Sequence, residues 1–172
     1  MQKPQSGRET VMQADDYFAI QNVLFSYPFA LDAGDFDAVG ELLGDAIVYS
    51  GGAVMADRDP AAVAAAFRNW VITYPDGTPR TRHMLANVMI VPEGEDRARV
   101  SSYVMVFQQA EDGPLAPVIG GDYLDRLEKR DGRWRIVERT MGNDIVGDLS
   151  RHGRDFGTIK PTRANGAKPL AG

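Results

Sequence analysis

The sequence predicts an α+β domain in which about three helices pack on one face of a curved antiparallel sheet. Helical periodicity is confined to the first part of the chain, whereas the later part alternates apolar and polar residues between short turns. The chain has 172 residues, of which 44% are apolar, and this suffices for one domain of ordinary size. Long, twisted strands can curl around the helices into a half-open cone, whose mouth would form a deep apolar pocket.

The chain divides into a leader, a domain and a tail. Residues 1–14 are polar and aperiodic, which predicts a disordered leader. Residues 15–148 carry the periodic segments and form the expected domain. Residues 149–172 are glycine-rich, polar and weakly basic, which predicts a solvated C-terminal tail.

A first helix is predicted over residues 15–33, because apolar side chains recur there at intervals of three and four. These side chains are Tyr17, Ile20, Leu24, Tyr27 and Leu31. Pro28 removes a backbone donor within this run, so we expect a kink or a break at that position. Gly34 ends the helix, and Asp35 can cap a short second helix over residues 36–43.

The next segments predict a strand and a third helix. Residues 46–50 are β-branched and aromatic, and Gly51-Gly52 ends that strand. Asp59 is a favourable N-cap and Pro60 suits the first helical position, ahead of an alanine-rich helix over residues 61–70. The remaining strands are predicted over residues 83–91, 97–109, 118–130 and 133–145, separated by turns rich in glycine and acidic residues.

Composition excludes several classes of function. The formal net charge is −5, which argues against nucleic acid as a partner. There are no cysteines and only two histidines, so thiolate zinc sites and three-imidazole metal sites cannot form. No apolar run is long enough to span a membrane and no signal peptide is recognisable, which favours the cytoplasm. No dinucleotide or phosphate loop is present either, so we expect no metal and no cofactor.

Asp32 falls among apolar positions of the first helix. Phe18, Phe25 and Phe29 lie within about 60° of it around the helix axis. A buried carboxylate is costly unless it has a partner. Asp32 therefore either meets a partner in the core or caps the next turn in a half-exposed position, and the sequence leaves both readings open.

His83 opens the strand over residues 83–91 and by alternation shares one face with Leu85 and Asn87. Polar side chains on either side of an apolar one suit the wall of a pocket, although a lone histidine is more often a surface residue at a strand end. His152 lies in the polar tail, where we expect it to be exposed to solvent.

Together, Asp32 and His83 predict a general base. A carboxylate that hydrogen-bonds one imidazole nitrogen fixes the tautomer and raises the basicity of the other nitrogen, without metal or cofactor. Asn87 is a candidate for positioning a substrate. Tyrosines are candidate donors to a developing oxyanion. The tyrosines on predicted elements are Tyr27, Tyr49, Tyr103 and Tyr123.

The chain resembles the SnoaL-like branch of the nuclear-transport-factor-2-like superfamily over residues 15–148. Residues 27–36 (YPFALDAGDF) resemble its first-helix signature, and residues 82–87 (RHMLAN) resemble its Arg-His-x-x-x-Asn strand. Residues 121–127 and 132–136 resemble its closing hairpin.

The resemblance implies a cone-shaped fold and an enzyme. Its relatives scytalone dehydratase, bile acid 7α-dehydratase and hexachlorocyclohexane dehydrochlorinase use a His–Asp pair for cofactor-free elimination. That pair falls on His83 and Asp32, and a tyrosine of the bile acid enzyme matches Tyr27. We therefore expect a dehydratase-like lyase or an isomerase that acts on an apolar cyclic, carbonyl-bearing small molecule, with Tyr49 or Tyr103 as a second donor. The superfamily also contains polyketide cyclases and non-catalytic oxygenase subunits, so a cyclase and a ligand-binding or structural subunit are the alternatives.

The strand over residues 97–109 is apolar on both faces. One face of this strand carries Val104 and Val106, and the other face carries Tyr103, Met105 and Phe107. Soluble monomers avoid large exposed apolar patches, so we expect a homo-oligomer that covers the outer face, unless the tail after Gly147 folds over it. The resemblance to the dehydratases favours a trimer over a dimer.

Overall fold

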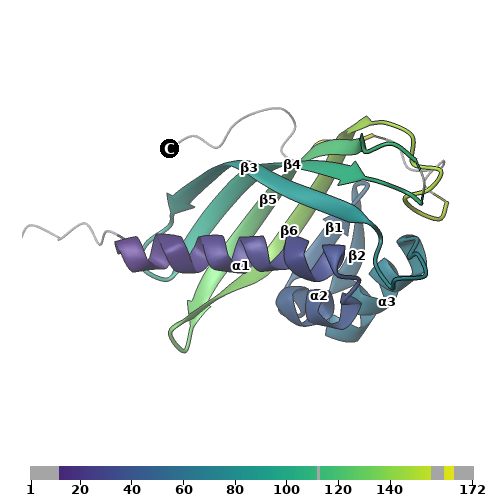
Figure 1. Ribbon diagram of the computed structural model, residues 1–172. Helices are drawn as coiled ribbons and strands as arrows, with labels where there is room; N and C mark the ends of the chain where they lie inside the picture. The colour runs from purple at the N-terminus through teal and green to yellow at the C-terminus, as the bar shows by residue number, and fades with distance from the viewer. Residues whose placement is uncertain (1–11, 112, 156–160, 165–172) are drawn as a thin grey trace, which may run out of the picture.

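Figure 1 shows the computed structural model, which describes residues 12–111, 113–155 and 161–164. Of the expected leader, residues 1–11 lie outside this part. The helices are α1 (Ala14–Asp32), α2 (Phe36–Leu43) and α3 (Pro60–Trp70). The strands are β1 (Ile47–Ser50), β2 (Ala53–Asp57), β3 (Thr81–Pro92), β4 (Arg97–Gln108), β5 (Ala116–Arg130) and β6 (Arg133–Val146).

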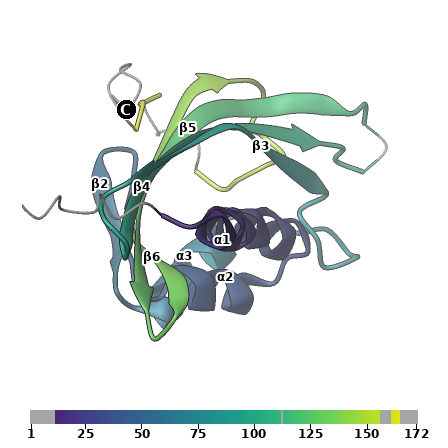
Figure 2. The same ribbon diagram turned by 90° about the vertical axis from the view of Figure 1, so that its left-hand side faces the viewer.

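The strands form one curved sheet in the order β2-β1-β6-β5-β4-β3. Figure 2 looks along α1 and shows the sheet arching over this helix, with α2 and α3 beside it. The expected α+β class is confirmed, but the sheet is mixed, because β1 pairs with β6 in parallel. Hairpin turns fix the direction of sequential strands only, and β1 and β6 are far apart in the chain.

α1 is held against the hollow of the sheet by one apolar stripe. Ile20, Leu24, Tyr27 and Leu31 are 0–4% exposed, at the spacing that the sequence predicted. The helix continues through Pro28 to Asp32, so the expected break at the proline does not occur. The lost backbone hydrogen bond is tolerated because buried contacts on both sides of Pro28 keep α1 on the sheet.

The caps of the shorter helices follow the prediction. The Asp35 carboxylate accepts a hydrogen bond from the Ala38 N–H at 3.0 Å, and Asp59 accepts one from Ala62 at 3.0 Å. α2 and α3 pack closely because Gly40 has no side chain. A Cβ on this glycine would lie 2.4 Å from the Pro60 carbonyl oxygen. Among the described helices, none has the length and apolarity needed to cross a membrane.

A β-bulge interrupts β3 near its middle. The register with β4 shifts between Ala86 and Met89, and Asn87 has a positive φ of 50°. Before the bulge, His83 and Leu85 face inward, and after it Val88 and Ile90 are the half-buried positions. The bulge therefore reverses which residues of β3 face the helices.

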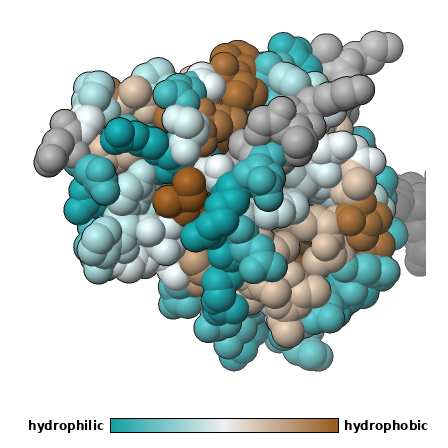
Figure 3. All heavy atoms as spheres, turned by 90° about the vertical axis from the view of Figure 1, so that its right-hand side faces the viewer, coloured by the Kyte–Doolittle hydropathy of each residue, from teal (hydrophilic) through white to brown (hydrophobic). Residues whose placement is uncertain are grey.

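The segment after β6 folds back across the open end of the sheet. The Ile72 N–H donates to the His152 carbonyl at 3.1 Å, and the Arg154 N–H donates to the Trp70 carbonyl at 2.8 Å. The Arg154 guanidinium also donates to carbonyls at the end of α3, those of Arg68, Asn69 and Val71. Figure 3 views this end of the molecule, where a hydrophilic band runs beside apolar areas. Of the expected solvated tail, residues 149–154 are thus held against this end of the domain, with His152 and Gly153 buried. Residues 156–160 and 165–172 of the tail lie outside the described residues.

Candidate functional site

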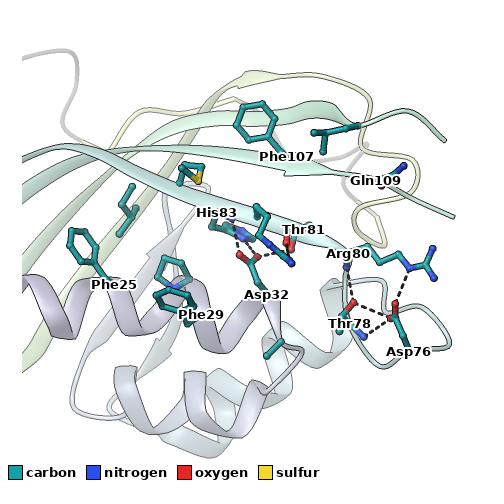
Figure 4. A pocket seen from close by; sticks show the side chains of 16 residues that line it. Phe25, Phe29, Asp32, Asp76, Thr78, Arg80, Thr81, His83, Phe107 and Gln109 are labelled. Atoms are coloured by element: carbon teal, nitrogen blue, oxygen red, sulfur yellow. Dashed lines mark hydrogen bonds and ion pairs between the residues drawn. The ribbon is translucent and has the colours of Figure 1, made fainter. Parts of the chain in front are cut away.

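The last residue of α1, Asp32, forms a hydrogen-bonded cluster with two residues at the start of β3, Thr81 and His83. Asp32 Oδ1 lies 2.6 Å from His83 Nδ1 and accepts a hydrogen bond from the Thr81 hydroxyl at 2.7 Å. Asp32 Oδ2 accepts the His83 backbone N–H at 2.9 Å. The side chains of His83 and Asp32 are only 7% and 12% exposed. Asp32 therefore meets a partner on β3 instead of capping the next turn, and Figure 4 shows the two side chains pointing at each other.

The cluster fixes the charge of Asp32. Burial by itself would raise the pKa of this carboxyl, but the hydrogen bonds and charge of His83 and the Thr81 hydroxyl outweigh burial and hold the pKa below its usual value. An ionised carboxylate at His83 Nδ1 requires that this nitrogen carry the proton. Nε2 is then the nitrogen that can accept a proton from a ligand.

A small cavity lies on the inner side of His83, between α1, α3 and the sheet. Its volume is about 60 Å³, less than half of the roughly 150 Å³ that accommodate benzene in an engineered protein cavity. The deep pocket expected inside the cone is therefore mostly filled. The side chains that line the remaining cavity include Tyr27, Phe67, His83, Tyr123, Met141 and His152.

Tyr27 lies on the wall of this cavity, as expected for a donor near His83. It is 1% exposed, and its hydroxyl donates to Met141 Sδ at 3.9 Å. Burial, followed by the neighbouring Tyr123, raises the pKa of Tyr27 well above its usual value. The phenol therefore stays protonated, which keeps it a hydrogen-bond donor at neutral pH.

A buried ion pair packs against the rings of Tyr27 and Tyr123. The Arg139 guanidinium lies 4.6 Å from the ring centre of Tyr27 and 5.0 Å from that of Tyr123. Arg139 donates two hydrogen bonds to Asp125, at 2.7 and 2.9 Å, and both side chains are fully buried. Asp125 sits at an inward position between Tyr123 and Leu127, so strand alternation alone could have placed it in the core.

His152 belongs to the site and was missed by the sequence analysis. It is 6% exposed and lines the same small cavity as His83, so the expectation that it faces solvent is wrong. Burial, with the nearby charge of His83, lowers the pKa of His152 to about 4. The imidazole is therefore neutral at neutral pH. One signal in the tail was Leu149, an apolar residue that packs against the core.

A larger groove lies on the other side of the Asp32–His83 pair, along the free edge of β3. Its volume is about 950 Å³, and both Asp32 and His83 line it. Phe25 and Phe29 of α1 border the groove below β3, and Phe107 of β4 borders it above, as Figure 4 shows. This volume falls within the range of roughly 300–1,000 Å³ that is typical of small-molecule sites.

Three of the expected substrate-binding residues lie elsewhere. Asn87 and Tyr103 are exposed and line a separate hollow on the outer face of the sheet. The bulge in β3 turns Asn87 outward, and alternation along β4 turns Tyr103 outward. Tyr49 of β1 lines neither space beside His83, whereas the next residue, Ser50, lines the inner cavity. The expected role of these three residues near the base is therefore not supported.

The described residues contain no group of three or more His, Asp or Glu side chains placed to hold a metal ion. The His83 ring has one nitrogen engaged by Asp32, and His152 is the other imidazole of the site. The arrangement offers one polarised imidazole, one neutral imidazole and buried phenols. These groups are suited to moving a proton and to stabilising a developing oxyanion.

Comparison with known proteins decides the family. The family model described as the SnoaL-like domain matches residues 12–140. The chain belongs to the SnoaL-like family. No curated protein gives a match. The SnoaL-like match ends within β6, so the C-terminal segment that carries His152 lies beyond it.

Solved structures share this SnoaL-like fold. A Mycobacterium tuberculosis protein of unknown function is 27% identical, with a TM-score of 0.62 over 80% of this chain and 82% of that one. A scytalone dehydratase-like protein from Novosphingobium aromaticivorans is 20% identical, with a TM-score of 0.64 over 90% of this chain and 96% of that one. A protein from the same organism, assigned as the beta subunit of an aromatic-ring-hydroxylating dioxygenase, is 19% identical, with a TM-score of 0.60 over 80% and 95%. The last two likenesses show the fold alone.

Proposed function

We propose that this SnoaL-like protein is a cofactor-independent lyase of the dehydratase type, or an isomerase, with His83 as its general base. The substrate is an apolar cyclic small molecule that carries a carbonyl or another acidifying group. The observation that carries the proposal is the 2.6 Å contact between Asp32 Oδ1 and His83 Nδ1, at a point that borders both the cavity and the groove.

In this mechanism His83 Nε2 removes a carbon-bound proton. The imidazolium that forms is stabilised by the Asp32 carboxylate, which Thr81 and the His83 backbone hold in place. In an isomerase the electron pair moves toward the carbonyl oxygen, and the His83 imidazolium returns its proton to another carbon of the substrate. In a lyase the electron pair expels a hydroxide, which takes the proton from the His83 imidazolium and leaves as water. Tyr27 donates a hydrogen bond to the developing oxyanion from the cavity side. No step requires a metal or an organic cofactor, so activity should survive exhaustive dialysis against a chelator.

The alternative is a non-catalytic ligand-binding or structural subunit of an oxygenase. It is favoured by the fold shared with the dioxygenase beta-subunit protein. A structural subunit does not need a charged carboxylate tied to an imidazole that borders an open groove. A polyketide cyclase would use the same base for an aldol closure, and its product would contain a new carbon–carbon bond.

Deuterium exchange tests the proposed base without knowledge of the natural substrate. The protein is incubated in D₂O with a panel of cyclic ketones, and mass spectrometry records deuterium incorporation next to the carbonyl. We expect at least one ketone to exchange faster with the protein than with the His83→Ala variant. If no ligand in the panel, and no ligand that co-purifies with the protein, exchanges above the buffer rate, the subunit reading is preferred.

A further inference from the structure

The groove along β3 has strongly apolar walls for an exposed surface. Phe29 is 78% exposed and Phe25 is 36% exposed, although both line the groove. Met84 of β3, also in the lining, is 56% exposed. Phe107 of β4 lines the groove from the other face of the sheet, above β3 in Figure 4. Exposed aromatic rings in a groove lining favour a ligand with a planar ring system, because stacked or edge-on rings add to simple burial.

The charged groups of the groove are paired, with one exception. Asp76 accepts a hydrogen bond from Arg80 Nε at 3.0 Å, so these two charges offset each other. The Asp32 carboxylate is saturated by Thr81 and His83. Among the described residues, no carboxylate lies within ion-pair distance of Arg82, whose guanidinium donates to the Thr81 carbonyl at 2.6 Å.

Arg82 is placed where it can act on a ligand of this groove. It is exposed, it precedes His83 in the chain, and it lies directly opposite Phe107 in the register of β3 with β4. A guanidinium presents several donors in one plane and matches carboxylate and phosphate oxygens. The groove thus offers a cation next to aromatic walls and within one residue of the proposed base.

We propose that the groove binds a planar, apolar ring system that bears an anionic oxygen group. The anion lies at Arg82, and the rings lie against Phe25 and Phe29. The groove passes around the free edge of β3, so the ligand reaches His83 across this edge, whereas the cavity of about 60 Å³ admits only its smallest group. That the groove is a reaction site rests on the proposed function, whereas the binding of such a ligand in the groove is independent of it.

Two fluorescent dyes with the same aromatic body test the proposal. 8-Anilinonaphthalene-1-sulfonate is anionic, and N-phenyl-1-naphthylamine is its neutral counterpart. We expect the wild-type protein to bind the anionic dye about 5- to 10-fold more tightly than the neutral one, as charge-assisted contacts do. Arg82→Ser should abolish this preference, whereas Arg133→Ser, an exposed arginine at the far hairpin, should preserve it.

Two phenylalanines of α1 provide a second pair of variants, which tests whether the dyes bind in the groove. Phe29→Ser should weaken both dyes several-fold, because the ring lines the groove. Phe18→Ser should weaken neither, since Phe18 is on the same helix and 65% exposed but lies outside the lining. An anion preference that persists in Arg82→Ser, or dye affinities unaffected by Phe29→Ser, would overturn the proposal. Dye binding needs no proton transfer, so a protein that binds as expected but exchanges no deuterium contradicts the base and leaves the groove intact.

Discussion

His152 is a site residue whose pKa is strongly lowered by folding. Its pKa falls to about 4 from the usual 6.5, because the C-terminal segment buries it beside His83. The unfolded chain therefore binds a proton at this side chain between pH 4 and 6.5 that the folded chain does not bind. The sign follows directly: folding stability rises with pH across this window and is lost as the pH falls through it.

We predict that the free energy of unfolding drops by about 2 kcal/mol between pH 7.5 and 5 through His152 alone. His152→Gln removes that part of the pH dependence, which urea unfolding at the two pH values measures as the difference between the proteins. The chain has two histidines, so NMR can follow each Hε1 signal after assignment with this variant. A His152 signal that titrates near 6.5 would contradict the buried placement.

The site residues differ in how far the sequence reveals them. Asp32 and His83 could be found because each is a polar residue on a periodic apolar segment. Their contact joins residues that are 51 positions apart in the chain. The sequence leaves open whether Asp32 meets a partner in the core or caps the next turn. His152 could not be found in this way. The segment that buries it is held by hydrogen bonds to α3 and the residues after it, many of them to backbone carbonyls, and such bonds leave no periodic pattern in the sequence.

At the scale of elements, the hairpin of β5 and β6 carries the ion pair beneath the tyrosines. Asp125 and Arg139 are direct cross-strand partners and are fully buried. Removing one partner leaves an uncompensated charge in the core. We therefore predict that Arg139→Met destabilises the fold by about 3–5 kcal/mol, measured by urea unfolding.

The matched control replaces both charges. The double variant Asp125→Leu with Arg139→Met should recover much of the lost stability, because neither charge is then buried alone. Arg135→Met, on the same strand but paired with Asp45 at the surface, should change stability by about 1 kcal/mol or less. If the double variant is as unstable as Arg139→Met, the loss of stability comes from lost packing around the tyrosines and not from the unpaired Asp125 carboxylate.

The elements themselves were largely predictable, with two informative exceptions. The long strands and all three helices lie within a few residues of the expected positions, because their periodicity and caps are local signals. The sequence analysis does not predict β2, because this strand has only five residues and two of them are alanines. Gly51-Gly52, which the sequence analysis interprets as the end of a strand, forms the hairpin turn between β1 and β2. The bulge after Ala86 was missed because it interrupts an otherwise regular alternation.

At the scale of the whole molecule, the outer face of the sheet is apolar and open. Tyr103 is 59% exposed, Met105 37% and Ile145 64%, and a hollow of about 670 Å³ lies between them. Residues 161–164 cover part of this face, where Arg163 pairs with Asp144 and the Ala164 N–H donates to Asp122. The remaining apolar area supports the proposal that the protein forms a homo-oligomer through this face.

Sedimentation at micromolar concentration measures the assembly. We expect a trimer, three times 18.8 kDa or about 56 kDa, in preference to a dimer. Tyr103→Lys should dissociate it, whereas Val54→Lys, with a similar exposure of 56% on β2, should not. A monomer at all concentrations would reject the assembly, and a dimer would keep the interface but not the trimer.

The central claim is that Asp32 and His83 act as one base, and a double-mutant comparison of the deuterium-exchange rate tests it most directly. Asp32→Asn and His83→Ala should each lower the rate on the order of 100-fold, since each removes the polarised imidazole. The double variant should be little slower than the worse single variant, because nothing of the pair remains to be lost. Full additivity of the two losses, or an unchanged rate in either single variant, would contradict the account.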